Sequence, residues 1–305
     1  MMGSLLKAAS ATTFALACMG GAAVAQDAPL KIGMTFQEMN NPYFVSMQKA
    51  LDDAAKSIGA TVVVTDARHD VSKQISDVED MIQQGIKILI VNPTDSVGIG
   101  QAVQAADDAG IVVVAVDANA SGPVDSFVGS KNRDAGYQSC KYLAQALGGQ
   151  GEVAILDGIP VVPILQRVEG CKAALGEASG IKLVDVQNGK QERDTALSVT
   201  ENMIQAHPNL KGIFSVNDGG AMGVMSAIDA SGKDIKLTSV DGAPEAVNAI
   251  KGGGSFIETT AQFPRDQIRI GLGMALAKFW GANVPKEVPI DVKVVDKKNA
   301  AGFSW

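Results

Sequence analysis

Histidine and cysteine are scarce in this chain, which has two histidines and three cysteines among 305 residues. His69 and His207 lie far apart, and neither has neighbouring His, Cys or carboxylate residues at the spacing of a metal site. Glycine is missing from Gln37 to Asn41, where a dinucleotide enzyme carries its glycine-rich turn. No P-loop, nucleophile elbow or metalloprotease motif is present. We therefore expect no metal ion, no cofactor and no enzymatic activity.

An excess of basic charge and long apolar runs are also absent. The chain has 26 Lys and Arg against 33 Asp and Glu, a net charge of −7. Such a charge balance does not attract nucleic acid or an anionic membrane. After the first 25 residues, no segment reaches the roughly 20 apolar residues of a membrane span. We expect a soluble mature protein.

The first 25 residues have the pattern of a secretion signal. Lys7 is their only charge, an apolar stretch runs from Thr12 to Met19, and Ala23-Val24-Ala25 is a small-x-small cleavage site. We predict export to the periplasm with cleavage after Ala25, which leaves 280 residues with one basic residue fewer and a net charge of −8. The alternative is a lipid anchor on Cys18, although Leu16 lies one place too close to the cysteine for a lipobox.

Two cysteines remain after this cleavage, and each lies in a stretch that we interpret as helical. In an oxidising compartment Cys140 and Cys171 could form one disulfide. The alternative is that both are small buried apolar residues with free thiols.

Short β-branched runs alternate with amphipathic runs, which is typical of βαβ units and parallel sheets. The first series of predicted strands is Leu30 to Phe36, Ala60 to Thr65, Ile86 to Val91 and Ile111 to Val116. The second series is Glu152 to Leu156, Ile181 to Val186, Gly212 to Val216 and Lys236 to Val240. Because the length also exceeds that of a usual single domain, we predict two α/β domains, each a doubly wound parallel sheet covered on both faces.

The boundary between these domains is predicted near Asn119 to Asn132, which is rich in Ser, Gly, Asp and Pro and contains a short strand, Ser126 to Val128. A final alternation is surplus to the second series. It consists of Ser255 to Gln262, a helix from Arg265 to Trp280 and a strand from Ile290 to Val294. We expect this segment to return to the first domain.

The segment Asn40 to Phe44 follows the first predicted strand and begins the first helix. Pro42 suits the first helical turn, and Asn41 stands at the cap position before it. Tyr43 and Phe44 are then placed at the mouth of the sheet, where aromatic faces can stack on the C–H patches of a sugar ring or polyol. The alternative is that both rings only pack against the domain core.

Hydrogen-bonding side chains follow the later strands in the same way. Ligands of open parallel sheets bind beyond the carboxyl ends of the strands, and carboxylates, amides and an arginine fork pair well with vicinal hydroxyls. The candidates are Asp117, Arg167, Asn217, Asp218, Asp241 and Gln262. Any one Asp or Asn could instead cap the next helix, and we accept that interpretation for Asp218 and in part for Asn217. Capping does not easily explain Asp241 and Gln262, which precede Gly242-Ala243-Pro244 and Phe263-Pro264.

These motifs together resemble the ribose-binding group of periplasmic substrate-binding proteins, which serve ABC sugar importers. The resemblance runs from about Leu30 to Val295. The matching pieces are Asn40-Asn41-Pro42-Tyr43-Phe44, Val91-Asn92-Pro93-Thr94-Asp95-Ser96, Val116-Asp117, Gln166-Arg167-Val168-Glu169-Gly170, Asn217-Asp218, Val240-Asp241-Gly242-Ala243-Pro244 and Ala261-Gln262-Phe263-Pro264.

The resemblance implies a type I periplasmic binding protein fold, with two lobes joined by a three-segment hinge that closes on a ligand. The N-terminal lobe would comprise residues 26–131 plus about 263–291, and the C-terminal lobe residues 132–262 plus about 292–305. The closed form would deliver its ligand, as a monomer, to an ABC permease in the inner membrane. By position in the matching motifs, the resemblance also implies which residues contact the ligand: Asn41, Tyr43, Phe44, Asp117, Arg167, Asn217, Asp241 and Gln262.

Two positions depart from the ribose-type pattern. Ala118 stands where ribose binders have an arginine, and Gln191 stands where they have an aromatic residue, followed here by Glu192-Arg193. We add Gln191 to the expected ligand contacts, and Glu38 as a nearby carboxylate. Tyr43 and Phe44 would then be a one-sided apolar wall, which favours a small or acyclic polyol over a flat ring, although a pentose stays possible.

Two other functions compete with import. A sugar-responsive transcription regulator shares this fold, but it would begin with a helix-turn-helix where this chain has a secretion signal. A sensory sugar-binding protein, linked to a chemoreceptor or a quorum signal, cannot be separated from an importer by sequence.

Overall fold

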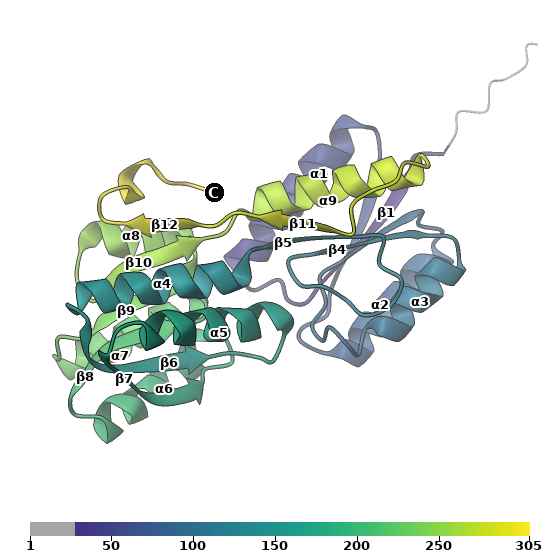
Figure 1. Cartoon of the computed structure of the whole chain (residues 1–305). Coiled ribbons are helices and arrows are strands. Elements are labelled where there is room, and N and C mark those ends of the chain that lie inside the picture. Colours follow the sequence, from purple (N-terminus) through teal and green to yellow (C-terminus); the bar gives the residue numbers. More distant parts are fainter. Residues whose placement is uncertain (1–27) are drawn as a thin grey trace, which may run out of the picture.

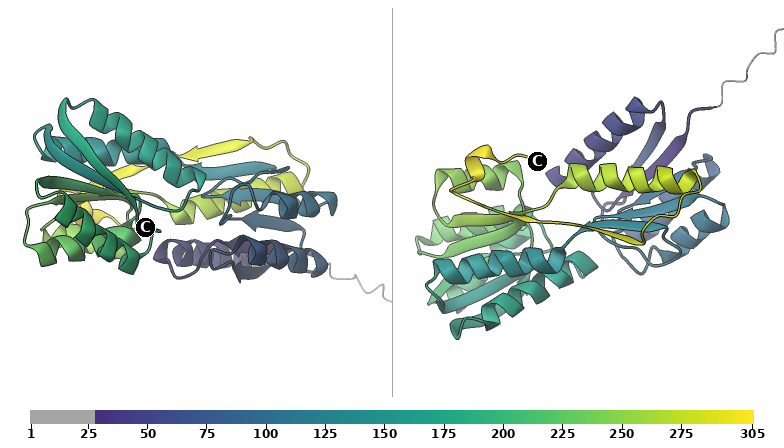
Figure 2. Two further views of the ribbon diagram at one scale, coloured as in Figure 1. Left: turned by 90° about the horizontal axis from the view of Figure 1, so that it is seen from below. Right: turned by 45° about the horizontal axis from the view of Figure 1, so that its top comes forward.

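The computed structural model describes residues 28–305, which form two α/β lobes that lie side by side (Figures 1 and 2). The predicted signal peptide, the cleavage site after Ala25 and the alternative anchor at Cys18 lie outside the described residues. Each lobe contains one six-stranded sheet. No helix in the described part of the chain is long and apolar enough to cross a membrane.

The first sheet has the strand order β11-β5-β4-β3-β1-β2, and all of its neighbouring strands are parallel. Its strands are β1 (Lys31–Phe36), β2 (Thr61–Asp66), β3 (Ile88–Val91), β4 (Val112–Val116), β5 (Ser126–Ser130) and β11 (Glu287–Ile290). Helices α1 (Pro42–Ser57) and α9 (Pro264–Phe279) cover one face, and α2 (Val71–Gln83) and α3 (Gly100–Asp108) cover the other (Figure 1). A separate apolar core fills each interface between sheet and helices.

The second sheet has the order β12-β10-β9-β8-β6-β7 and is parallel except for the pair β10 and β12. Its strands are β6 (Gln150–Asp157), β7 (Gly180–Asn188), β8 (Leu210–Ser215), β9 (Lys236–Asp241), β10 (Phe256–Ala261) and β12 (Lys293–Asp296). Helices α4 (Asn132–Ala146) and α5 (Val162–Gly176) pack on one face. Helices α6 (Arg193–Ala206), α7 (Asp218–Ser231) and α8 (Pro244–Gly252) pack on the other. A short 3-10 helix, η1 (Ala300–Gly302), follows β12.

The chain crosses between the lobes at three places in the described residues: between β5 and α4, between β10 and α9, and between β11 and β12 (Figure 2). The predicted fold class, two doubly wound parallel-sheet domains with three connecting segments, is confirmed. The expected return of the last segment to the first domain is right for α9 and β11, since β11 pairs with β5, but wrong for Ser255 to Gln262, because β10 pairs with β9 and β12 in the second sheet.

One predicted strand is wrong. The alternating stretch from Ile290 to Val294 is predicted to form a single strand, but β11 ends at Ile290 and β12 begins at Lys293. The residues between them are the third crossing segment. A short β-branched run is therefore divided between the edges of two different sheets, which its local pattern cannot reveal.

Helices α4 and α5 are in close backbone contact. A Cβ atom added to Gly136 would lie 1.9 Å from the Arg167 carbonyl oxygen, and one added to Gly170 would lie 1.9 Å from the Arg133 carbonyl oxygen. Cys140 and Cys171 form a disulfide one turn further along the same interface, with Cα atoms 4.9 Å apart. This interface fixes α5, which carries Arg167, against the helix that follows the first crossing.

Candidate ligand-binding site

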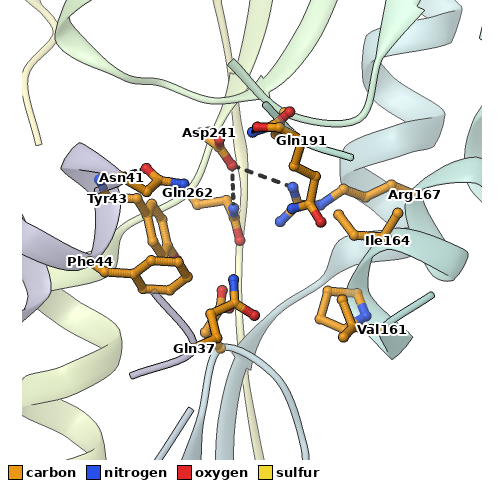
Figure 3. A pocket seen from close by; sticks show the side chains of 13 residues that line it. Gln37, Asn41, Tyr43, Phe44, Val161, Ile164, Arg167, Gln191, Asp241 and Gln262 are labelled. Atoms are coloured by element: carbon orange, nitrogen blue, oxygen red, sulfur yellow. Dashed lines mark hydrogen bonds and ion pairs between the residues drawn. The ribbon is translucent and has the colours of Figure 1, made fainter. Parts of the chain in front are cut away.

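A cavity lies between the lobes, where the carboxyl ends of strands from the two sheets face each other (Figure 3). The space inside it that atoms do not fill is about 370 Å³, including its opening to solvent. The structure brings all nine predicted contact residues to this cavity: Asn41, Tyr43, Phe44, Asp117, Arg167, Gln191, Asn217, Asp241 and Gln262. Four further residues also line it, namely Gln37, Val161, Pro163 and Ile164.

The aromatic wall is built at the start of α1. Asn41 is the N-cap, and its side-chain oxygen accepts a hydrogen bond of 3.0 Å from the Tyr43 backbone N–H, as the position of Pro42 predicted. The rings of Tyr43 and Phe44 meet edge to face, with centroids 5.2 Å apart. Both also join the core under α1 and α9, so the two interpretations of these rings are compatible rather than exclusive.

Asp117 follows β4 in a tight turn, in which the Ala118 amide donates to the Val116 carbonyl and Asp117 has a φ of +64°. Its carboxylate accepts a 3.2 Å hydrogen bond from the side-chain nitrogen of Asn92, which follows β3. The side-chain oxygen of Asn92 accepts a hydrogen bond from the backbone N–H of Gln37. Burial raises the pKa of Asp117 to about 6, while Arg167 acts in the opposite direction. Asn92 thus positions an acidic acceptor at the cavity.

Arg167 extends from α5 into the cavity and is 4% exposed. Its Nε donates to Asn132, at the start of α4, over 2.9 Å. Its Nη1 donates to the Val216 carbonyl at 2.8 Å and lies 3.4 Å from an Asp241 carboxylate oxygen. No described residue accepts from Nη2, so this end of the guanidinium has donors left for a ligand.

Asp241 ends β9, and its carboxylate is held by donors from three directions. Arg167 and Gln262 reach one oxygen, the latter at 2.8 Å, and the Asp218 backbone N–H reaches the other at 3.2 Å (Figure 3). Burial raises the pKa of Asp241, and Arg167 opposes this shift. The carboxylate therefore joins the end of β9 to α5, to the start of α7 and to the second crossing segment.

The predicted cap role of Asp218 is wrong. Asn217 is the N-cap of α7, since its side-chain oxygen accepts a 3.1 Å hydrogen bond from the Gly220 amide. Asp218 is instead a buried carboxyl that accepts from Ser239, from Thr259 and from the Ala243 amide. Burial and the neighbouring Asp241 raise the pKa of Asp218 to about 8.

Asn217 lines the cavity as well as capping α7, and its amide donates to the Gln191 backbone carbonyl at 3.2 Å. Gln191 lies in the turn between β7 and α6 with a φ of +64°. Its side-chain oxygen accepts from the Ile159 amide at 3.3 Å. The two residues join the turn after β7 to the start of α7.

The expectation of a one-sided apolar wall needs correction. Val161 and Ile164, at the start of α5, form an aliphatic surface across the cavity from Tyr43 and Phe44 (Figure 3), and Pro163 between them also lines the cavity. The second wall is aliphatic rather than aromatic. Pro163 in the first turn of α5 is the same local signal as Pro42 in α1, and it could have indicated this wall from the sequence.

Three polar atoms at the cavity are buried without a hydrogen-bond partner: the side-chain oxygens of Gln37 and Gln262, and the Tyr43 hydroxyl. Burial and the neighbouring carboxylates raise the pKa of Tyr43, so its hydroxyl keeps its proton. Buried polar groups are rarely left unpaired, because each one costs about 1–3 kcal/mol. Gln37 directly follows β1, so the rule used for the other strands would also have selected it.

Glu38 is buried beside this site but does not line it. Its carboxylate accepts from Asn41 at 3.4 Å and lies 3.0 Å from His69 Nε2. The Glu38 hydrogen bond raises the pKa of His69. Among the described residues, no group of His, Cys, Asp and Glu side chains could hold a metal ion.

Two lobes joined by three crossings, with a polar cavity between them, are the architecture of a protein that binds a small molecule between its lobes. The chain belongs to the periplasmic binding protein family, whose domain model matches residues 32–282. It is 36% identical to the ribose import binding protein of Bacillus subtilis, over 88% of this chain and 87% of that protein. It is 28% identical to the xylitol-binding protein of Mycolicibacterium smegmatis, over 93% of this chain and 82% of that protein. The solved structure of the Caulobacter myo-inositol binding protein with myo-inositol superposes on this chain with a TM-score of 0.86 at 30% identity. The match covers 92% of this chain and 98% of that protein.

Proposed function

We propose that this chain binds a small uncharged sugar or sugar alcohol between its lobes and delivers it to an ABC permease in the inner membrane. The relatives support this class of ligand, because ribose, xylitol and myo-inositol all combine several hydroxyls with a compact carbon skeleton. The name of the Bacillus subtilis relative favours import over the sensory alternative. A binding role also accounts for the site without any catalytic step.

The observation that carries the proposal is the set of unpaired polar atoms around the cavity. The oxygens of Gln37 and Gln262 accept hydrogen bonds, the Tyr43 hydroxyl donates or accepts, and Arg167 Nη2 donates. Vicinal hydroxyls can satisfy all of these groups, because each hydroxyl both donates and accepts. A purely apolar ligand would leave them unpaired, at a cost of about 1–3 kcal/mol for each group.

The walls favour a short or puckered carbon skeleton. Tyr43 and Phe44 offer ring faces and edges on one side, and Val161 and Ile164 offer branched aliphatic groups on the other. Gln191 contributes an amide where a second flat ring would complete a sandwich. We therefore propose a pentose or a sugar alcohol of similar size as the ligand.

Closure follows from the distribution of the contacts. Asn41, Tyr43, Phe44 and Asp117 belong to the first lobe, and Arg167, Gln191, Asn217 and Asp241 belong to the second. A ligand that touches both sets has more contacts in the closed arrangement than in an open one, and its binding energy shifts the population towards closure. The three crossing segments would be the hinge, and the protein would act as a monomer.

Export completes the proposal. The relatives belong to a periplasmic family, which supports removal of residues 1–25 during export. Cleavage after Ala25, rather than a lipid anchor at Cys18, fits the pattern of the leader. The Cys140–Cys171 disulfide is also typical of an oxidising compartment.

A thermal-shift screen tests the ligand class. Purified mature protein should be stabilised by at least one of D-ribose, D-allose, xylitol, erythritol and myo-inositol, and not by the charged sugar D-glucuronate. A ligand at 100 times its Kd adds about 2.7 kcal/mol, which raises the Tm by roughly 5–10 °C for a protein of this size. Stabilisation by none of the five would contradict the proposal.

Arg167→Ala tests the site itself. Loss of a charged donor should weaken binding of the best ligand about 10- to 100-fold, as expected for a hydrogen bond worth roughly 1.5–3 kcal/mol. The matched control is Arg133→Ala, because Arg133 is exposed on α4 and pairs with Glu169 outside the cavity. Isothermal titration should show the loss only in the Arg167 variant, and equal affinities would remove Arg167 from the site.

A further inference from the structure

After η1 the chain turns back towards the region between the lobes (Figure 1). The Phe303 ring packs on Phe263, in the second crossing, with centroids 6.3 Å apart. The Lys293 ammonium, directly after the third crossing, lies 6.0 Å from the centroid of the same Phe303 ring. These contacts direct the chain towards the cavity and place Trp305 beside it.

Trp305 contacts one cavity residue from each lobe. Its indole Nε1 donates to the backbone carbonyl of Asp241, in the second lobe, over 3.0 Å. Its ring stands edge-on to Tyr43, in the first lobe, with centroids 5.8 Å apart and an interplanar angle of 83°. The indole also packs against the core beneath α1 and α9.

The contact with Asp241 falls at a strained position. Asp241 has a φ of +138°, which residues with a side chain rarely adopt. The backbone carbonyl of Asp241 accepts two hydrogen bonds, one of 2.9 Å from the backbone N–H of Gln262 and one from the Trp305 indole. With both lone pairs occupied, the peptide group is held in the orientation that aims the Asp241 carboxylate at Arg167.

We infer that Trp305 is a positioning residue for ligand binding, which holds Tyr43 through its edge-to-face contact and couples the two lobes in the closed arrangement. The inference rests on the proposed sugar-binding function. Rotation of the lobes away from each other separates Tyr43 from Asp241, so Trp305 cannot keep both contacts in an open form. Its contacts therefore add to the stability of the closed form and slow the release of the ligand.

Two substitutions separate the contributions of Trp305. Trp305→Phe keeps an aromatic contact to Tyr43 but removes the N–H donor, and Trp305→Ala removes both. A hydrogen bond worth about 0.5–1.5 kcal/mol predicts a 2- to 10-fold loss of affinity for Trp305→Phe, and Trp305→Ala should lose more. The probes are D-ribose, xylitol and myo-inositol, measured by isothermal titration, with dissociation rates from stopped-flow experiments. The loss should appear mainly as faster dissociation, while the unliganded Tm changes little.

Trp280 provides the matched control, because it is the other tryptophan of the chain, is 73% exposed and directly follows the C-terminal end of α9. Trp280→Phe should bind as the wild type does, and its remaining fluorescence, from Trp305, should change when a probe binds. If Trp305→Ala retains the wild-type affinity and dissociation rate, the inference is overturned and the binding function stands. If the wild type binds none of these probes and neither D-allose nor erythritol, the proposed function fails and the inference fails with it.

Discussion

Glu258 lies in the interior of the second lobe, and its protonation state should control stability as a function of pH. It is fully buried on β10, where its carboxyl lies 2.8 Å from the Ser139 hydroxyl and 2.6 Å from the Thr260 hydroxyl. Ser139 also lies 3.1 Å from the Ser239 carbonyl, which only accepts. Because Ser139 has one proton to give, its bond to Ser239 requires Glu258 to donate. The geometry thus favours a protonated Glu258.

The magnitude follows from the pKa. Burial raises the pKa of Glu258 from 4.5 to about 8, and Asp218 and Asp296 add to the shift. Between these values the folded protein holds a proton that the unfolded chain has released. The free energy of unfolding therefore decreases by about 1.4 kcal/mol per pH unit as the pH rises, in total by about 5 kcal/mol, and this contribution is constant below 4.5 and above 8.

Glu258→Gln removes this dependence and keeps the hydrogen bonds, because a glutamine amide can donate to Ser139 while its oxygen accepts from Thr260. Urea unfolding at pH 5, 6, 7 and 8 should show a variant that matches the wild type near pH 5 and becomes progressively more stable than it towards pH 8. Asp117 is present in both proteins, and its contribution cancels in the difference. The control is Glu79→Gln, on the exposed face of α2. Parallel pH profiles for the Glu258 variant and the wild type would refute the reasoning.

Two further predictions concern the site and its support. With a pKa of about 6, Asp117 accepts from ligand hydroxyls as a carboxylate only above this pH, so ligand affinity should fall as the pH drops below about 6. Asp117→Asn should bind more weakly at pH 7.5 and show a flat titration profile; an unchanged decline in that variant would assign the effect to another group. Replacing Cys140 and Cys171 by alanine should lower the free energy of unfolding by about 4 kcal/mol, as the closed loop predicts. The double replacement should also weaken ligand binding, because the disulfide holds α5, which carries Arg167. If the variant binds the ligand with the wild-type affinity, the disulfide contributes to stability and not to binding.

The sequence predicted the cavity well because the relevant rule is geometric. Residues directly after parallel strands meet at one edge of a sheet, so Asp117, Asn217 and Asp241 converge whatever lies between them in the chain. Gln37 satisfies the same rule and was overlooked. The aliphatic wall at Val161 could be read from the proline that starts α5, but its position opposite the aromatic pair depends on how the lobes face each other.

Other features depend on contacts that no local pattern contains. The stretch from Ile290 to Val294 has the β-branched character of one strand, yet its two halves pair with β5 and β10 in different lobes. Asp218 and Asn217 are both good cap residues, and only the packing of β9 and β10 decides which of them is buried with Ser239 and Thr259. Trp305 acquires its partners only after both lobes and all three crossings are in place.

The cavity is also where the protein concentrates energetically unfavourable features. Asp117, Gln191 and Asp241 have positive φ values, and such backbone positions cost of order 1 kcal/mol or more for residues with a side chain. Asp117 and Asp241 are buried acids with raised pKa values, and nearby polar atoms lack partners. A ligand that donates to the carboxylates and fills the open hydrogen bonds relieves part of this cost only when both lobes reach it. In the proposed function, the same unfavourable features that lower the stability of the empty protein would therefore make closure depend on the ligand.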